Sequence, residues 1–190
     1  IRFYPEEEAN NDEFSKKLAG LGEIYVNDAF SCSHRNHASV SKITKYLPSY
    51  SGLQITAEVN ALNKITNEIK RPVTCIIGGS KISSKINVIK NLIPKFNNII
   101  IVGAMANNIF KYKGLNVGNS IYEKNMDNII KEMFKYANNN KCKIYFPKDV
   151  KVGKKLSDKS IEKELDEIEV DDMILDVGSK TIVEIKEIID

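Results

Sequence analysis

The spacing of hydrophobic residues divides the sequence into helical and extended segments. In residues 52–69 apolar positions recur every three or four residues, which predicts one helix of about five turns. Residues 125–138 show the same helical spacing, with an apolar stripe typical of core packing. Short runs rich in β-branched residues predict strands at 74–77, 99–102, 143–146 and 173–177. Helices are also predicted at 84–93, 105–112 and from 180, so strands and helices alternate. This alternation predicts an α/β fold with a parallel sheet covered on both faces.

The first fifty residues and the stretch before the last strand carry weaker patterns. Asp12 is expected to cap a helix that runs to Leu21. The β-favouring run at 23–30 predicts a buried strand that ends in a polar loop at 31–37. Residues 149–169 are polar and charged, which favours a loop or short edge structure. The sequence Arg71-Pro72 ends the long helix, because proline cannot continue it. We therefore predict three parts: residues 1–51, a connecting helix at 52–70, and residues 71–190.

The composition fits a folded, water-soluble protein. Apolar residues make up 42% and the net charge is only +3, so charge alone implies neither a nucleic acid nor an acidic membrane as partner. The longest apolar runs are too short to cross a bilayer, and we expect a cytoplasmic protein. Three widely spaced cysteines form no CxxC pair, which indicates reduced thiols without a zinc site.

The segment with the clearest candidate functional residues is 76–85, which reads IIGGSKISSK. Glycines let a backbone approach a phosphate, and Lys81 and Lys85 could meet its negative charge. The segment matches neither the Walker P-loop nor GxGxxG, so a plain strand-turn-helix with solvated lysines is an equal alternative. A second turn, around Gly103 and Ala104, follows the next strand and could face the first turn, although a simple tight connection also explains it.

A polar and basic loop at residues 27–35 offers a second place for an anion. Arginine binds phosphate through a planar fork, so Arg35, together with Arg2, could clamp one. The alternative is that each arginine is a solvated surface charge. Cys32 lies near His34 in sequence, but closeness in sequence does not establish the geometry of a catalytic triad. His34 and His37 have no further metal-ligating residues nearby in the sequence. We therefore expect no metal held by the protein alone.

Six ordered motifs resemble those of the phosphoglycerate kinase family across essentially the whole chain. They read RFYPEEE, YVNDAFSCSHRNHAS, RPVTCIIGGSKISSKINVI, VGAMANNIF, FPKDV and MILDVGSKT. The resemblance implies parts of two Rossmann-like lobes, one for the substrate (1–51) and one for the nucleotide (71–190), joined by the 52–70 helix. It also implies an internal segment that lacks both ends of the family's chain. Val102 and Ala104 stand where the family has glycines, which is expected to narrow the adenine pocket.

The resemblance implies roles for individual residues. Arg2 and Arg35 would bind the phosphate of 3-phosphoglycerate, with His34 lining the same basic patch, and Asn27 and Asp28 would shape the loop. The nucleotide site is implied to comprise the phosphate turn Gly79, Ser80 and Lys81, the phosphoryl-following Lys85, the adenine wall Gly103 and Ala104, and Leu175 at its edge.

The implied reaction is in-line phosphoryl transfer between 1,3-bisphosphoglycerate and ADP with Mg²⁺, giving 3-phosphoglycerate and ATP in glycolysis. Lys85 and Arg35 would stabilise the transferring charge, and hinge closure across the connecting helix would bring the ligands together. The resemblance suggests a monomer. Because the segment completes neither half-site, we expect little or no turnover from it alone. A non-catalytic fragment that binds phosphorylated ligands is the alternative, whereas a dinucleotide-dependent oxidoreductase is disfavoured by the absence of GxGxxG.

Overall fold

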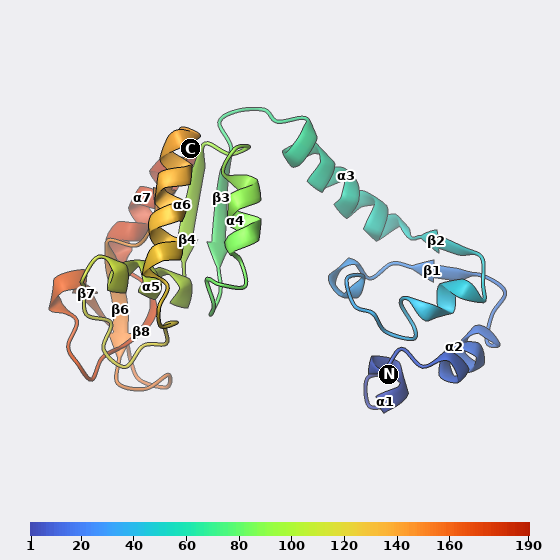
Figure 1. Ribbon diagram of the computed structural model, residues 1–190. Coiled ribbons are helices and arrows are strands. Elements are labelled where there is room, and N and C mark those ends of the chain that lie inside the picture. The colour runs from blue at the N-terminus through green and yellow to red at the C-terminus, as the bar shows by residue number, and fades with distance from the viewer. The chain divides into compact units, whose positions relative to one another are not determined.

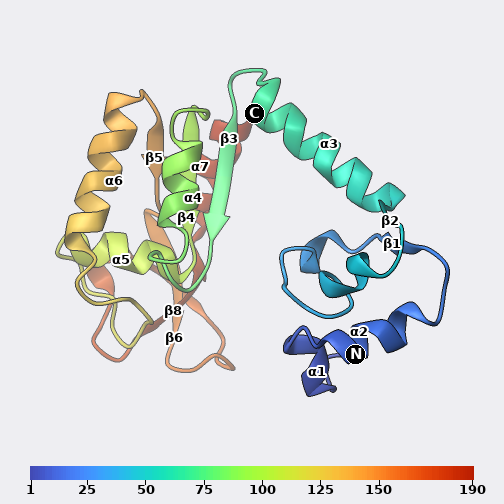
Figure 2. The same cartoon turned by 45° about the vertical axis from the view of Figure 1, so that its right-hand side comes forward.

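A computed structural model describes residues 1–190, which form two compact units, Ile1–Glu68 and Ile69–Asp190 (Figures 1 and 2). The first unit contains the helices α1 (Pro5–Glu8), α2 (Asp12–Ala19) and α3 (Leu53–Asn67), the 3-10 helices η1 (Phe30–Cys32) and η2 (Lys42–Lys45), and the strands β1 (Tyr25–Asn27) and β2 (Ser49–Ser51). The two strands pair in parallel, with Val26 opposite Tyr50.

Two expectations for the first unit are wrong in detail. The cap of α2 is Asn11 and not Asp12, because the Asn11 side chain accepts a hydrogen bond from the Phe14 N–H at 3.0 Å. The predicted strand at 23–30 shrinks to the three residues of β1 and is not buried, since Val26 is 52% exposed. It ends at Asn27, whose side chain accepts from the Ala29 N–H and so turns the backbone.

The long helix predicted at 52–70 is α3, and it lies wholly within the first unit. None of its 15 residues is buried, so little tertiary packing supports it. Its first turn is instead held by Asp28, whose Oδ1 accepts from the Ile55 N–H at 3.1 Å. Gly52 at the N-cap allows this approach, because a Cβ there would overlap the Asp28 side chain. Although α3 is long, none of the helices has the length and apolarity needed to cross a membrane.

The second unit confirms the predicted alternation of parallel strands and helices. Strands β3 (Thr74–Gly78), β4 (Asn98–Val102) and β5 (Lys143–Tyr145) form a parallel sheet in that order. The helices between them are α4 (Ile86–Leu92), α5 (Ala104–Tyr112) and α6 (Asp127–Asn139). Helices α4 and α6 (Figure 1) contribute Ile89 and Met133 to a fully buried core that also contains Ile99 and Ile101 of β4. The class is therefore α/β, as predicted.

The prediction of a loop or short edge structure at 149–169 is wrong for residues 149–153 and is confirmed for residues 161–164, which form an edge strand. β6 (Asp149–Gly153) is the central strand of a second, antiparallel sheet in the order β7–β6–β8, with β7 at Ile161–Glu164 and β8 at Met173–Val177. Val150 and Val152 are buried against a cluster that includes Phe110 of α5. The alternation of valine with polar residues was the missed strand signal.

The last helix, α7 (Ser179–Ile189), repeats the capping arrangement of α3. Asp149 accepts from the backbone N–H groups of Lys180 and Thr181 at 2.9 and 2.8 Å. Burial raises the pKa of Asp149, but these N–H groups and the Thr181 hydroxyl outweigh it, so the net pKa is lowered. In both units, a carboxylate that follows or begins a strand thus fixes the start of a distant helix.

Candidate functional site

Two glycine turns lie together where neighbouring parallel strands of the second unit end. The first follows β3 and contains Gly79, and the second follows β4 and contains Gly103. The Met105 N–H donates to the Gly79 carbonyl at 3.0 Å, which ties one turn to the other. Both glycines have positive φ, +155° and +66°, a backbone region that residues with a Cβ rarely adopt. The carboxyl ends of parallel strands are where such sheets bind ligands.

The residues between Gly79 and α4 form a turn that is held by hydrogen bonds to Glu123, a residue outside the turn. Ser83 donates through its N–H and hydroxyl to the Glu123 carboxylate, at 2.9 and 2.6 Å, and the Ser84 hydroxyl donates to the Lys81 carbonyl. These bonds from Ser83 hold the pKa of Glu123 below its ordinary value. The helix begins at Ile86 and not at Ser84 as predicted, because residues 83–85 form this turn.

The predicted phosphate-binding lysines are both available to an anion. Lys81 and Lys85 are exposed, and neither has a carboxylate within ion-pair distance. Ser80 between Gly79 and Lys81 is also exposed. A glycine turn with two unpaired ammonium groups is a suitable place for a polyanion.

A narrow hollow of about 70 Å³ adjoins the second glycine turn. Three residues implied for the adenine site, Gly103, Ala104 and Leu175, line it together. Asn107 and Asp176 are its polar lining residues. The remaining lining residues are apolar and come from α5, β6, β8 and the segment between β5 and β6: Ala106, Phe110, Pro147, Val150, Ile174 and Val177. We call this the second-unit hollow. Its size and lining suit the edge of a flat ring.

The two arginines of the first unit also lie together. Arg2 and Arg35 line one hollow of about 930 Å³, which we call the first-unit hollow. Arg35 is exposed and forms no ion pair, whereas Arg2 lies 3.7 Å from the exposed carboxylate of Glu8. His34 is exposed but does not line this hollow, and His37 does. The loop therefore presents a different histidine from the one that the sequence indicated.

Glu7 is a structural residue of this hollow that sequence reasoning missed. It is 1% exposed, accepts from the Ser39 N–H and hydroxyl at 3.0 and 2.5 Å, and lies 3.8 Å from His37 Nδ1. Its own carbonyl accepts from the Ala38 N–H. Glu7 thus joins α1 to the loop that carries Arg35. No sequence signal separates it from Glu6 and Glu8 beside it.

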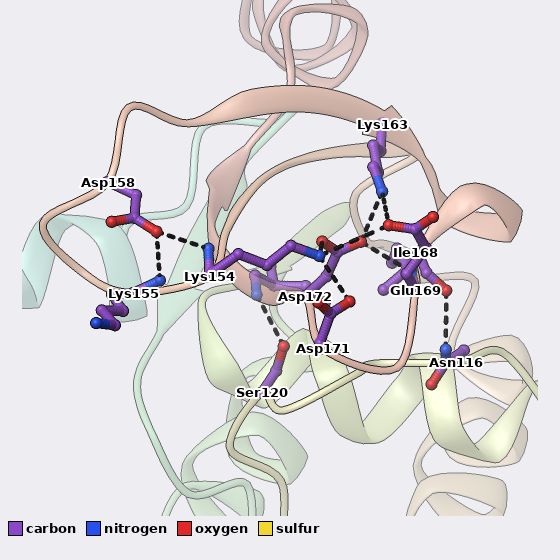
Figure 3. A network of polar contacts seen from close by, with 11 residues as sticks. Asn116, Ser120, Lys154, Lys155, Asp158, Lys163, Ile168, Glu169, Asp171 and Asp172 are labelled. Atoms are coloured by element: carbon purple, nitrogen blue, oxygen red, sulfur yellow. Dashed lines mark hydrogen bonds and ion pairs between the residues drawn. The ribbon is translucent and has the colours of Figure 1, made fainter.

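An acidic cluster in the second unit is paired with two lysines. Glu169, Asp171 and Asp172 lie close enough together to hold a metal ion. Lys154 Nζ, however, lies 2.6 Å from Asp171 and 3.0 Å from Asp172, and Lys163 Nζ lies 2.8 Å from Asp172 (Figure 3). These ion pairs raise the pKa of both lysines, chiefly through the hydrogen bonds to Asp171 and Asp172 for Lys154 and through those to Asp172 and Glu169 for Lys163. The cluster therefore acts as a clasp between β7 and the turn before β8.

Comparisons with known proteins point to one family. The model of the family described as phosphoglycerate kinase matches residues 1–190. The phosphoglycerate kinases of Wolbachia pipientis wMel and Bartonella bacilliformis are 43% and 42% identical over the whole chain, which spans 48% of each relative's length. The solved phosphoglycerate kinase of Coxiella burnetii is 30% identical and superposes with a TM-score of 0.75 over 99% of this chain and 49% of that one.

Proposed function

The chain belongs to the phosphoglycerate kinase family, and we propose that it carries one half-site for each ligand of the transfer between 1,3-bisphosphoglycerate and ADP. It spans about half the length of the curated relatives it matches. The observation that carries the proposal is the grouping of the family's implied residues in two places: the arginines in the first-unit hollow, and the glycine turns with their lysines in the second unit.

In the first unit, Arg2 and Arg35 hold the phosphate of 3-phosphoglycerate or 1,3-bisphosphoglycerate. The planar guanidinium of Arg35 has no protein carboxylate to compete with the ligand. Glu7 keeps the loop in place, because its carboxylate accepts two hydrogen bonds from Ser39 and lies 3.8 Å from His37 Nδ1. His34 lies outside the hollow, so its contribution to the same basic patch rests on the family resemblance and not on the lining of the hollow.

In the second unit, Gly79, Ser80 and Lys81 hold the phosphates of ADP or ATP, and Gly103 and Ala104 form a wall for the adenine. Lys85 meets the charge that spreads over the equatorial oxygens of the transferring phosphoryl group. The charged side chains of this turn, Lys81 and Lys85, are cations, and the nearby Glu123 carboxylate already accepts two hydrogen bonds from Ser83. Mg²⁺ therefore enters as part of the nucleotide substrate, where it neutralises phosphate charge.

We propose that the intact parent protein is a monomeric cytoplasmic enzyme of glycolysis that has no nucleic acid or membrane as partner. For the 190-residue chain alone we expect binding of both ligands with little or no turnover in a coupled ADP/ATP assay. A near-normal rate in that assay would show that the chain is a complete enzyme.

Titration calorimetry tests the two half-sites separately. Replacing Arg35 by Gln is expected to weaken 3-phosphoglycerate binding about tenfold or more and to leave ADP binding unchanged, because a charge-assisted hydrogen bond contributes about 1.5–3 kcal/mol. Replacing Lys81 by Gln is expected to do the reverse. Lys17→Gln, an exposed lysine of α2 outside both hollows, is the control. Equal effects of all three variants on both ligands would refute the assignment.

A further inference from the structure

Residues 121–123 form a short segment that two consecutive asparagines of α5 hold in place. Asn107 Nδ2 donates to the Ile121 carbonyl at 2.9 Å, and Asn108 Oδ1 accepts from the Glu123 N–H at 2.9 Å. Both asparagines are only 2% exposed, so water competes little for these bonds. The side chain of Ile121 is 69% exposed and adds little packing, so the backbone bonds fix the segment. We call residues 121–123 the strap.

The strap presents one carboxylate, that of Glu123, to the first glycine turn. Its oxygens accept from the Ser83 N–H at 2.9 Å and from the Ser83 hydroxyl at 2.6 Å. Hydrogen bonds to an ionised acceptor are about twice as strong as those between neutral groups. Ser83 lies in the middle of the turn, two residues from Lys81 and two from Lys85. Glu123 therefore fixes the backbone from which both lysines extend.

The same turn has one other anchor outside itself, the side chain of Ile82, which is fully buried in the core of the second unit. The hydrogen bond from the Ser84 hydroxyl to the Lys81 carbonyl and the one from the Lys85 N–H to the Ile82 carbonyl both lie within the turn. The helix that follows, α4, has no side-chain cap at its start. Without Glu123, a mostly exposed turn would depend on a single buried side chain for its position.

We infer that Glu123 is a positioning residue for the nucleotide phosphates, because it orders the turn that carries Lys81 and Lys85 before the ligand arrives. The inference rests on the proposed function, since it takes this turn as the place of the phosphates. A turn that is already ordered does not have to lose its conformational freedom when the ligand binds, and affinity rises accordingly.

The charge of Glu123 by itself would have the opposite effect on an anion. Its carboxylate interacts with the charge of Lys81 and so reduces the positive potential of the turn. By charge alone, removal of Glu123 would therefore strengthen ADP binding. Removal of a positioning residue weakens it, so the sign of the change separates the two effects.

The test measures ADP binding to the 190-residue chain by calorimetry. We expect Glu123→Ala to bind ADP roughly 5- to 50-fold more weakly than the wild-type chain, the effect of having to order several turn residues on binding. Glu187→Ala removes an exposed carboxylate of α7 and is the control for charge, with an expected change of less than about twofold. Adenosine, which lacks the phosphates, should bind equally to the wild-type chain and to Glu123→Ala when followed by amide chemical shifts.

Ser83→Ala shows whether Glu123 acts through Ser83. This variant loses the hydroxyl bond but keeps the N–H bond, so its ADP binding should weaken roughly two- to tenfold. The double variant should bind ADP only as weakly as Glu123→Ala alone, because both substitutions break the same contact.

Each outcome decides the question. Unchanged or tighter ADP binding by Glu123→Ala would overturn the inference and leave the nucleotide half-site standing. An equal loss of adenosine binding, or a loss in the double variant equal to the product of the two single losses, would also overturn it. Should Glu123→Ala not fold, unchanged ADP binding by Ser83→Ala would overturn it. Absence of ADP binding to the wild-type chain would instead overturn the half-site itself.

Discussion

Replacing Asp172 by Asn should destabilise the second unit, because Asp172 is the centre of the lysine clasp. Its side chain is 2% exposed and accepts from Lys163 Nζ at 2.8 Å, Lys154 Nζ at 3.0 Å and the Glu169 N–H at 2.8 Å (Figure 3). An asparagine keeps the size but removes the charge and offers an N–H₂ group to donors. Lys163, whose side chain is largely buried, then keeps only the exposed carboxylate of Glu169 as a charged partner, whereas Lys154 keeps Asp171 and Glu169.

The magnitude follows from the pKa of Asp172. Burial raises it, but the hydrogen bonds from Lys163, the Glu169 N–H and Lys154 outweigh burial and lower the pKa from 3.8 to about 2. At about 1.36 kcal/mol for each tenfold change in proton affinity, this corresponds to roughly 2 kcal/mol of unfolding free energy at neutral pH. Because the folded pKa is the lower one, the contribution is complete above the unfolded pKa and is lost as pH falls from about 4 to about 2.

The assay is urea unfolding of the wild-type chain, Asp172→Asn and Asp171→Asn at pH 7 and at pH 3. Asp171 is the matched control, because it contacts Lys154 but is 67% exposed, so its loss should cost less than about 1 kcal/mol. We expect the cost of Asp172→Asn to be about 2 kcal/mol at pH 7 and about half of that at pH 3. A cost no larger than that of Asp171→Asn, or one that does not change with pH, would refute the reasoning.

Three further variants test the contacts that position the half-sites. Glu7→Gln should cost about 1–3 kcal/mol in urea unfolding, since it weakens the buried bonds to Ser39, whereas exposed Glu6→Gln should be nearly neutral; equal costs would contradict the role of Glu7. Asp28→Ala removes the cap of α3, so it should reduce the helical circular dichroism of the chain and lower the free energy of unfolding by about 1 kcal/mol. Gly52→Ala should cost at least as much, since its Cβ overlaps Asp28, and an unchanged spectrum in both variants would exclude this cap.

The sequence predicted the elements whose signals are local. Periodic apolar residues located α6 and α3, and β-branched runs located β3, β4 and β8. The sequence allowed the two glycine turns either to face each other or to be separate tight connections, and the Met105–Gly79 hydrogen bond shows that they lie together. These features depend on residues that are neighbours in sequence or on the rule that parallel strands end at one edge.

The contacts that the sequence did not predict join residues far apart in the chain. Glu7 and Ser39 are 32 residues apart, and Asp28 and Ile55 are 27 apart. From the sequence alone, an acidic residue at position 7 or 28 is interpreted as a solvated surface charge, because its partner is distant in the chain. Likewise, Asn107 belongs to a helix whose spacing alone says nothing of the strap that this residue holds.

Amide chemical-shift titration of the isotope-labelled chain tests the two half-sites most directly. We predict that 3-phosphoglycerate shifts the amides of Arg2 and of residues 31–39 in the first unit. ADP with Mg²⁺ should shift those of residues 78–85 and 103–107 in the second. Shifts by both ligands at the same amides, or none at either set, would contradict the assignment of one ligand to each unit.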